Sequence, residues 1–236
     1  MRRSLAMAGA LAGALAAGLL AACSSSPAGP QTATLTSAVR PSAATLNVLT
    51  GTTVLTIGTA DFGVSGSLLR VSTPRGGPSP HLRESTAKNG GGTVVDLSAP
   101  GASGVTVTLN ASVSWQLNLG GGTTRTDADL RGGQVRGIAF TAGSDIISLA
   151  LPKPHGDVPV QLGGGASQFQ VSVPHGVPAR VTAGGGAGEV TLDGHHYVGV
   201  AGGSVFTTPG WAQGRAGFDV RATAGAAELT VAARPS

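Results

Sequence analysis

Glycine-rich corners recur along this chain at a nearly constant interval, and they constrain its fold more than any other feature. The middle glycines of four corners are Gly121, Gly143, Gly164 and Gly185, and a second set falls between them at Gly132, Gly156, Gly176 and Gly194. A regular repeat of about 20 residues is typical of a solenoid, in which each coil stacks on the previous one. Glycine suits such corners because it accepts a positive φ without steric penalty.

Between the corners, apolar and polar side chains alternate as they do in half-buried strands. From Val105 to Leu119 every odd position is apolar and every even position is a small or amide-bearing polar residue. Strict alternation buries one face of a strand and leaves the other in water. An extended run of this length would span about 50 Å, so we expect a bend near Asn110-Ala111 that divides it into two strands.

The composition also favours short strands over helices. Charged residues make up 11% of the chain, aromatic residues 3%, and 39 residues are glycine, each of which would cost about 1 kcal/mol inside a helix. We find no capped helical pattern after residue 44. We therefore predict one all-β, solenoid-like domain over residues 45–236. The alternative fold is an antiparallel β-sandwich, which fits less well because sandwich loops vary in length.

Residues 1–22 predict a secretory signal peptide. Arg2 and Arg3 precede an uncharged stretch of mostly Ala, Gly and Leu, and a polar run of serines follows. This order of a charged, an apolar and a small-residue region is that of an export signal. A transmembrane anchor of similar length is the alternative, although so much Ala and Gly makes the segment weakly apolar for a permanent span.

The end of this segment, "LAAC", resembles the lipobox of bacterial lipoproteins. The resemblance implies cleavage between Ala22 and Cys23 and attachment of diacylglycerol to the Cys23 thiol. Cys23 is the only cysteine in the sequence, so it cannot form an intramolecular disulfide. Two fatty chains suffice for stable anchoring, whereas one binds only marginally. We therefore expect a lipid-anchored protein on the extracytoplasmic face of the cell membrane.

Residues 23–44 carry no periodic pattern and consist mainly of Ser, Pro, Ala and Thr. A segment of this composition is typical of a flexible linker. We predict a stalk that lifts the domain off the bilayer.

The segments "VSWQLNLGGGTTRTDADL", "IISLALPKPHGDVPVQLGGGASQFQVSVPHGVPARVTAGGGAGEV" and "FDVRATAGAAELTV" resemble a family of bacterial envelope domains known as adhesin-type domains, with a stacked-strand "toast-rack" arrangement. They are also similar to the C-terminal domain of some cell-envelope stress regulators. The resemblance covers about residues 95 to 233. It implies a β-solenoid with an extracytoplasmic or membrane-linked role, and it implies no catalytic residues.

Motifs that carry chemistry are scarce in this sequence. There is no G-x-S-x-G elbow, and no glycine triplet precedes a helical pattern, so we predict no catalytic residues, cofactor or metal. Asp127 and Asp129 lack the nonapeptide period of calcium-binding repeats, and we expect them to face solvent on a strand. Without Arg2 and Arg3, 13 basic residues are scattered singly against 11 acidic ones, which argues against nucleic-acid binding.

The histidines leave their roles open. His195 and His196 would point to opposite faces of a regular strand, so they could share a metal only in a turn. His155 and His175 occupy equivalent "PHG" corners and could stack about 4.8 Å apart in successive coils. Two stacked imidazoles would repel when charged, which would make the stack pH-sensitive. The plainer interpretation is an exposed turn or a packed ring for His195 and His196, and corner filling for His155 and His175.

The aromatic residues are interpreted first as structural. Trp115 falls in the apolar register and is expected in the core. Trp211 follows a Pro-Gly turn and is expected to cap the open end of the solenoid. The alternative for Trp115, Trp211 and Tyr197 is that they stack on glycans.

Together these features favour a non-enzymatic binding or scaffolding module of the cell envelope, with an envelope protein or a glycan as partner. One alternative is an envelope-stress sensor that acts on a membrane protein. A less favoured one is a wall-degrading or metal-dependent enzyme, which would need His195, His196 and an aspartate to converge.

Overall fold

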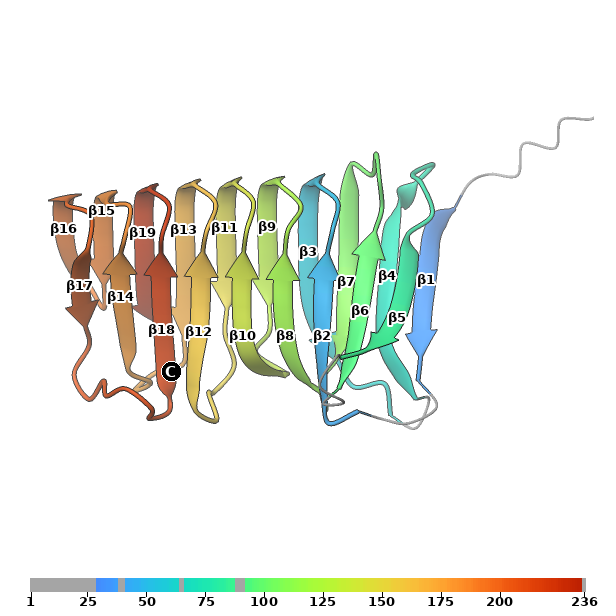
Figure 1. Ribbon diagram of the computed structural model, residues 1–236, viewed down its shortest axis with the longest axis horizontal. Coiled ribbons are helices and arrows are strands. Elements are labelled where there is room, and N and C mark those ends of the chain that lie inside the picture. The colour runs from blue at the N-terminus through green and yellow to red at the C-terminus, as the bar shows by residue number, and fades with distance from the viewer. Residues whose placement is uncertain (1–28, 38–40, 64–65, 88–91, 235–236) are drawn as a thin grey trace, which may run out of the picture.

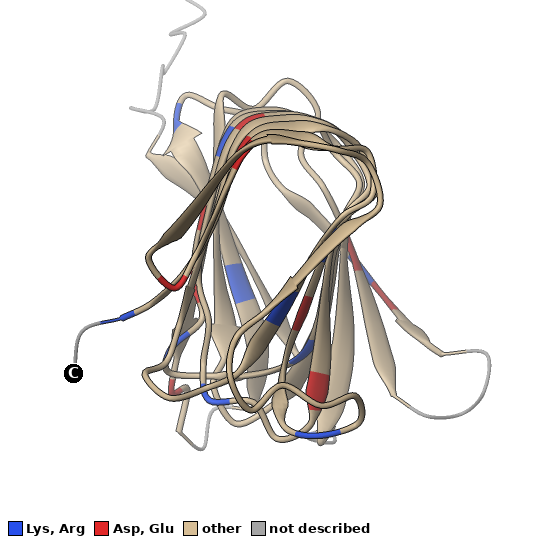
Figure 2. Ribbon diagram, turned by 90° about the vertical axis from the view of Figure 1, so that its left-hand side faces the viewer, with Lys and Arg blue, Asp and Glu red and all other residues tan. Residues whose placement is uncertain are grey.

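The computed structural model describes residues 29–37, 41–63, 66–87 and 92–234, which form nineteen strands and no helix. The strands make two sheets, of ten and nine strands, that face each other along the whole length of the molecule (Figure 1). Viewed along the stack, the coils nearly superimpose and charged residues are sparse (Figure 2). The predicted all-β solenoid is therefore confirmed. Among the described residues, no helix is long and apolar enough to cross a membrane.

We call the ten-stranded sheet A and the nine-stranded sheet B. In spatial order, sheet A contains β1 (Pro30–Thr36), β4 (Ser67–Arg75), β7 (Gly104–Asn110), β3 (Thr52–Ala60), β9 (Thr123–Asp129), β11 (Ser144–Ala150), β13 (Ala166–Val173), β19 (Ala226–Ala233), β15 (Ala187–Leu192) and β16 (His195–Val200). Sheet B contains β17 (Ser204–Thr207), β14 (Ala179–Ala183), β18 (Gly217–Ala222), β12 (Asp157–Leu162), β10 (Gln134–Phe140), β8 (Ser114–Leu119), β2 (Ala43–Val48), β6 (Thr93–Ser98) and β5 (His81–Thr86).

Each coil consists of a strand of sheet B followed by a strand of sheet A, and neighbouring coils pair in parallel. In the middle of the molecule the coils β8/β9, β10/β11 and β12/β13 follow one another as expected, with Thr126 opposite Ile147 and Ile147 opposite Phe169. Parallel pairing between coils excludes the antiparallel sandwich for this part of the chain.

Toward both ends, however, the coils are not stacked in sequence order, and the expectation that each coil follows its predecessor is wrong there. The coil β2/β3 lies between β6/β7 and β8/β9, so that Leu46 pairs with both Val95 and Leu117. The coil β18/β19 lies between β12/β13 and β14/β15, which brings Phe169 next to Leu229. A glycine period reports the length of a coil but not which coil it pairs with.

Polar side chains on the outer face of sheet B join the inserted strand β2 to its neighbours. The Asn47 Nδ2 donates to Asp96 Oδ1 on β6 at 2.7 Å, and Asn118 Nδ2 on β8 donates to Asn47 Oδ1 at 2.8 Å. Such specific bonds favour one order of coils over others that would bury equal apolar area.

The inserted strand β18 carries the corresponding contact at the other end. Asp219 is only 3% exposed, and its carboxylate accepts hydrogen bonds from Arg180 Nε at 2.9 Å on β14 and from Arg221 Nε at 2.8 Å. Burial by itself would raise the pKa of Asp219, but the hydrogen bonds from Arg180 and then Arg221 outweigh it, and the pKa is lowered below its ordinary value. Asp219 is therefore ionised at neutral pH and joins β18 to β14.

The corners from sheet B to sheet A form one edge of the solenoid, and glycine is required there by close packing. A Cβ on Gly185 would lie 2.6 Å from the Gly225 nitrogen of the adjacent coil, and one on Gly164 would overlap the backbone of Ala142. The corner N–H groups donate to the adjacent coil, as in Gly163 N to Phe140 O at 2.7 Å. The glycines at positions 121, 143, 164 and 185 all lie on this edge.

The long alternating run behaves as predicted. It bends after Asn110, so that β7 and β8 lie in different sheets, and its apolar positions in both strands are buried. Trp115 is fully buried, and its indole Nε1 donates to the Asn110 carbonyl at 3.0 Å. The prediction that Trp115 belongs to the core is confirmed.

The domain begins earlier than predicted. Strand β1 falls inside the segment expected to be a stalk, where it pairs antiparallel with β4, and β2 begins at Ala43. The stalk prediction is thus wrong for residues 30–36 and for 43–44. Gln31, Ala33 and Leu35 alternate with exposed threonines in β1, and this short alternation is the signal that the composition of the segment obscured.

Antiparallel strands close both ends of the stack. At the N-terminal end, β4 and β1 extend sheet A, and β5 extends sheet B. At the C-terminal end, Asp193 and Gly194 form a left-handed two-residue turn, with φ of 48° and 82°, that joins β15 to β16 as a hairpin. Gly194 is therefore a hairpin turn and not a solenoid corner.

Replacing Gly164 with Ala should destabilise the protein by about 3 kcal/mol, because the new methyl group overlaps the backbone of the neighbouring coil. Gly156→Ala is the matched control, since a Cβ there meets nothing within 4 Å. Urea unfolding of both variants measures the difference, and equal midpoints would show that the corners are not closely packed.

Asp219→Asn should cost about 3 kcal/mol at pH 7, because it leaves Arg180 without its buried partner. The lowered pKa of Asp219 means that its contribution is present above the ordinary value of 3.8 and is lost as the pH falls through its lower folded-state pKa. Unfolding measured between pH 7 and pH 2 should show the two proteins converging in acid. Asp145→Asn, which removes an exposed carboxylate, serves as the control and should change stability by less than about 0.5 kcal/mol.

Candidate functional site

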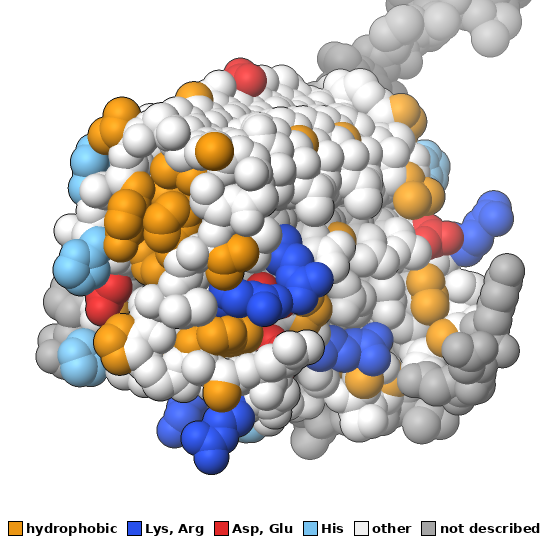
Figure 3. Space-filling model, turned by 60° about the vertical axis from the view of Figure 1, so that its left-hand side comes forward, with side chains coloured by type: hydrophobic (Ala, Val, Ile, Leu, Met, Phe, Trp, Pro, Cys, Tyr) orange, Lys and Arg blue, Asp and Glu red, His pale blue; other side chains and the backbone are white. Residues whose placement is uncertain are grey.

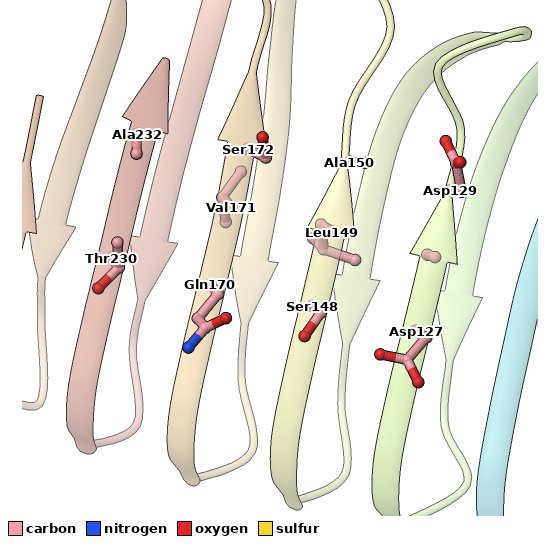
Figure 4. A pocket seen from close by; sticks show the side chains of 11 residues that line it. Asp127, Asp129, Ser148, Leu149, Ala150, Gln170, Val171, Ser172, Thr230 and Ala232 are labelled. Atoms are coloured by element: carbon pink, nitrogen blue, oxygen red, sulfur yellow. The ribbon is translucent and has the colours of Figure 1, made fainter. Parts of the chain in front are cut away.

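A shallow groove of about 390 Å³ lies over the outer face of sheet A, where it crosses β9, β11, β13 and β19 (Figure 4). Its polar residues come from four different coils that the stacking places side by side. They are Asp127 and Asp129 on β9, Ser148 on β11, Gln170 and Ser172 on β13, and Thr230 on β19.

The parallel register arranges these side chains in two rows along the solenoid axis. One row runs through Asp127, Ser148, Gln170 and Thr230, which are direct Cα partners. The next row runs through Asp129, Ala150, Ser172 and Ala232, most of which are small. Because side chains two residues apart share a face, the small second row forms the floor beside the taller first row.

The carboxylates of the groove are neutralised by arginines on their own strand or the following turn. Arg125 Nε lies 2.7 Å from Asp127 Oδ2, and Arg131 Nε donates to Asp129 Oδ1 at 2.7 Å. The hydrogen bond from the Arg131 side chain lowers the pKa of Asp129 against the smaller, opposing effect of burial. The prediction that both aspartates lie on a strand and face solvent is confirmed, and the groove carries little net charge.

The neutral polar groups of the groove are available to a ligand. Within the described part of the chain, Ser148, Gln170 and Ser172 make no side-chain hydrogen bond. On the outer face of sheet B, by contrast, the amides of Gln116 and Asn118 are bonded to neighbouring side chains. Among the described residues, the groove over sheet A therefore offers three uncommitted polar side chains on the neighbouring strands β11 and β13.

Apart from Asp127 and Asp129, the groove residues carry no signal in the sequence that marks them as a site. The alternation around Gln170 was evident, but it identified a strand and not a neighbour. Thr230 could not be placed beside Gln170, because the two are far apart in the chain and are brought together by the insertion of β18/β19.

The histidine pair does not converge with an aspartate. His196 Nδ1 lies 2.9 Å from Glu189 Oε1. His195 is the Cα partner of Leu192 on β15, and its side chain lies on the opposite face of β16 from that of His196. Within the described ranges, no group of three His, Cys, Asp or Glu side chains could hold a metal ion. The arrangement that an enzyme built on these histidines would need is not formed by these residues.

The proposed stack of His155 on His175 is wrong. Both side chains are exposed, and the strands that follow them, β12 and β14, are separated by β18. The equivalence of the two "PHG" corners in sequence does not make them neighbours, because the inserted coil takes the place between β12 and β14.

Trp211 lies elsewhere than the sequence predicted. Trp211 does not cap the open end but packs on Arg180, whose guanidinium carbon lies 5.4 Å from the ring centroid. The end is covered instead by Tyr197 of β16 and Phe206 of β17, whose ring centroids are 4.4 Å apart. A turn signal, Asp193-Gly194, marks this hairpin in the sequence and could have revealed the cap.

We define the C-terminal tip as strands β16 and β17, which are the outermost strands of the two sheets at that end. Apolar side chains gather on this end of the molecule (Figure 3). Val198 is 75% exposed, Val205 56% and Tyr197 40%, and these are three of the five large apolar residues that are exposed in the described part of the chain.

Ala22 and Cys23, the predicted cleavage and lipidation sites, lie outside the described residues, so the structure leaves both as predictions.

No protein-family model matches this chain, and no curated protein matches it in sequence. Among solved structures, the chain is similar to a "putative cell adhesion protein" from Clostridium sporogenes, with a TM-score of 0.63 and 17% identity. The similarity covers 86% of this chain and 98% of that protein. At this level of identity the match supports the fold, and the family resemblance drawn from the sequence stays a prediction.

Proposed function

We propose that this protein is a non-enzymatic binding module of the cell envelope, anchored to the extracytoplasmic face of the membrane through lipidated Cys23. The observation that carries the proposal is the groove over sheet A, in which uncommitted Ser148, Gln170 and Ser172 side chains lie beside carboxylates already paired with arginines. A solenoid that presents such a surface is suited to binding rather than to catalysis.

A neutral glycan is the ligand class that the groove fits best. Its hydroxyl groups both donate and accept hydrogen bonds, as do the serine and glutamine side chains of the groove. An extended peptide is recognised mainly through its backbone at a free strand edge, and the backbone groups of the groove strands are already engaged in the sheet. Ala150 and Ala232, on the floor of the groove, offer apolar contact to the C–H face of a sugar ring.

The groove is poorly suited to glycan hydrolysis. A hydrolase of the usual kind needs one carboxylic acid that remains protonated to assist the leaving group. The pKa of Asp129 is shifted the other way, because Arg131 favours the charged form. Asp127 is likewise paired with Arg125. This arrangement supports binding over catalysis.

The anchor would hold the N-terminal end of the solenoid close to the bilayer. Strand β1 begins at Pro30, so only the short segment 24–29 separates it from Cys23. A segment of this length spans about 20 Å at full extension. The module would therefore stand near the membrane surface and not at the end of a long stalk.

Replacing Cys23 with Ala should abolish attachment of the lipid, because the thiol that would carry it is lost. Fractionation of cells that express the wild-type chain and Cys23→Ala measures the outcome. The variant should appear unprocessed or in the soluble fraction. Ser24→Ala is the control and should remain in the membrane fraction, and unchanged attachment of a cleaved Cys23→Ala chain would refute lipidation.

Gln170→Ala should weaken glycan binding about fivefold, which corresponds to about 1 kcal/mol for one lost hydrogen bond. The assay is binding of the purified protein to an array of neutral polysaccharides. Gln161→Ala on β12 is the matched control, since it removes a glutamine that is also exposed, but on the outer face of sheet B. Equal losses in the two variants would place the binding surface elsewhere.

A further inference from the structure

We propose that the C-terminal tip docks the same tip of a second copy of this chain, so that two solenoids join end to end. The consequence for adhesion rests on the proposed membrane anchor. The docking itself rests on the edges, the apolar surface and the symmetry of the tip.

Both strands of the tip have a free edge. The Asp193-Gly194 turn makes Leu192 and His195 the closing pair of the hairpin. In an antiparallel ladder, alternate residues direct their N–H and C=O groups to opposite sides, so those of His196 and Val198 point away from β15. Strand β17 is likewise the last strand of sheet B. Unpaired rows of this kind are templates for a further strand.

The two ends of the solenoid differ in how these edges are protected. At the N-terminal end, the exposed side chains of β1 are mainly threonines, and those of β5 include Arg83 and Glu84. Charged and polar residues on edge strands prevent pairing with other chains. At the tip the corresponding positions include Val198 and Val205, which are exposed apolar residues. Of the two described ends, the tip therefore has the surface that association would bury.

A second copy fits this surface better than an unrelated chain because the symmetry satisfies both edges at once. A two-fold axis perpendicular to the sheets reverses the strand direction, so it pairs β16 with β16 of the second copy and β17 with its counterpart, both antiparallel. The same operation stacks the Tyr197–Phe206 rings of one copy on those of the other and continues the apolar core. An interface of this type is isologous, which is the commonest arrangement in dimers.

The left-handed Gly199, with φ of 64°, interrupts the ladder of β16 and limits pairing to the stretch from His195 to Val198. A short edge explains how the tip can associate reversibly without forming a continuous fibre. The polar N-terminal ends stop the assembly at two copies.

The two anchors would lie at opposite ends of the dimer. Ten strands spaced at about 4.8 Å make each solenoid about 43 Å long, and the N-terminal strand β1 lies at the end away from the tip. With tethers as short as the segment 24–29, tip-to-tip pairing would connect two facing membranes. This geometry would make the protein a homophilic adhesion module.

The test uses the full lipidated chain in phosphatidylcholine vesicles, with tagged protein in one population and untagged protein in another. Val198→Cys introduces a thiol at the tip, and Val54→Cys introduces one at an exposed position of β3 in the middle of the solenoid. A short bismaleimide should join tagged to untagged Val198→Cys chains at least about tenfold more efficiently than Val54→Cys chains, because pairing raises the effective concentration of the thiols. Adding Val205→Lys to Val198→Cys should reduce the yield, since it places a charge at the second edge.

Equal yields from Val198→Cys and Val54→Cys would overturn tip pairing, and so would an unchanged yield after Val205→Lys. Dimers that form only within one vesicle population would overturn the bridging of two membranes. Failure of the anchor is recognised separately. If Cys23 is not lipidated, maleimide will label the wild-type chain, whose only cysteine it is, and cross-linking is then scored on Val198→Cys with Cys23→Ser.

Discussion

The close approach of backbone to backbone at the glycine corners is the contact on which this solenoid depends. Adjacent coils are held at the spacing of a parallel ladder, and at the corner the chain must turn within that spacing while its N–H groups reach the carbonyls of the next coil. Any side chain at Gly164 or Gly185 would occupy space that the neighbouring backbone already fills. The glycines of these corners are a consequence of stacking the corners directly on one another.

Backbone contacts set the distance between adjacent coils. The outward side chains in the groove of sheet A are therefore not needed to hold the coils together and can carry function. Because the coils pair in register, outward side chains from four coils form continuous rows across the groove. Two outer side chains of sheet B have a structural role. Asn47 and Asp219 bond to neighbouring strands and specify where the inserted coils sit. In the groove on sheet A, Ser148, Gln170 and Ser172 make no such bond, which is why we place the proposed ligand there.

The antiparallel strands at the ends solve the problem that every open solenoid has, namely two unpaired edges and an exposed core. The N-terminal end does so with polar strands, whereas the C-terminal end covers its core with Tyr197 and Phe206 and leaves valines exposed. A protein that needed only to be stable would be expected to protect both ends alike. The asymmetry is what the proposed pairing of two copies uses.

The sequence by itself determined the all-β class, the nearly constant coil length, the bend after Asn110 and the buried place of Trp115, because alternation and glycine spacing are local consequences of strand and turn geometry. Only the tertiary structure decided the order of the coils, the strand β1 within the supposed stalk, the separation of His155 from His175 and the groove that joins Gln170 to Thr230. These features depend on which coil pairs with which. Coils of similar length and apolar pattern can stack in several orders, and the choice among them rests on a few contacts, such as those of Asn47 and Asp219, between residues far apart in the chain.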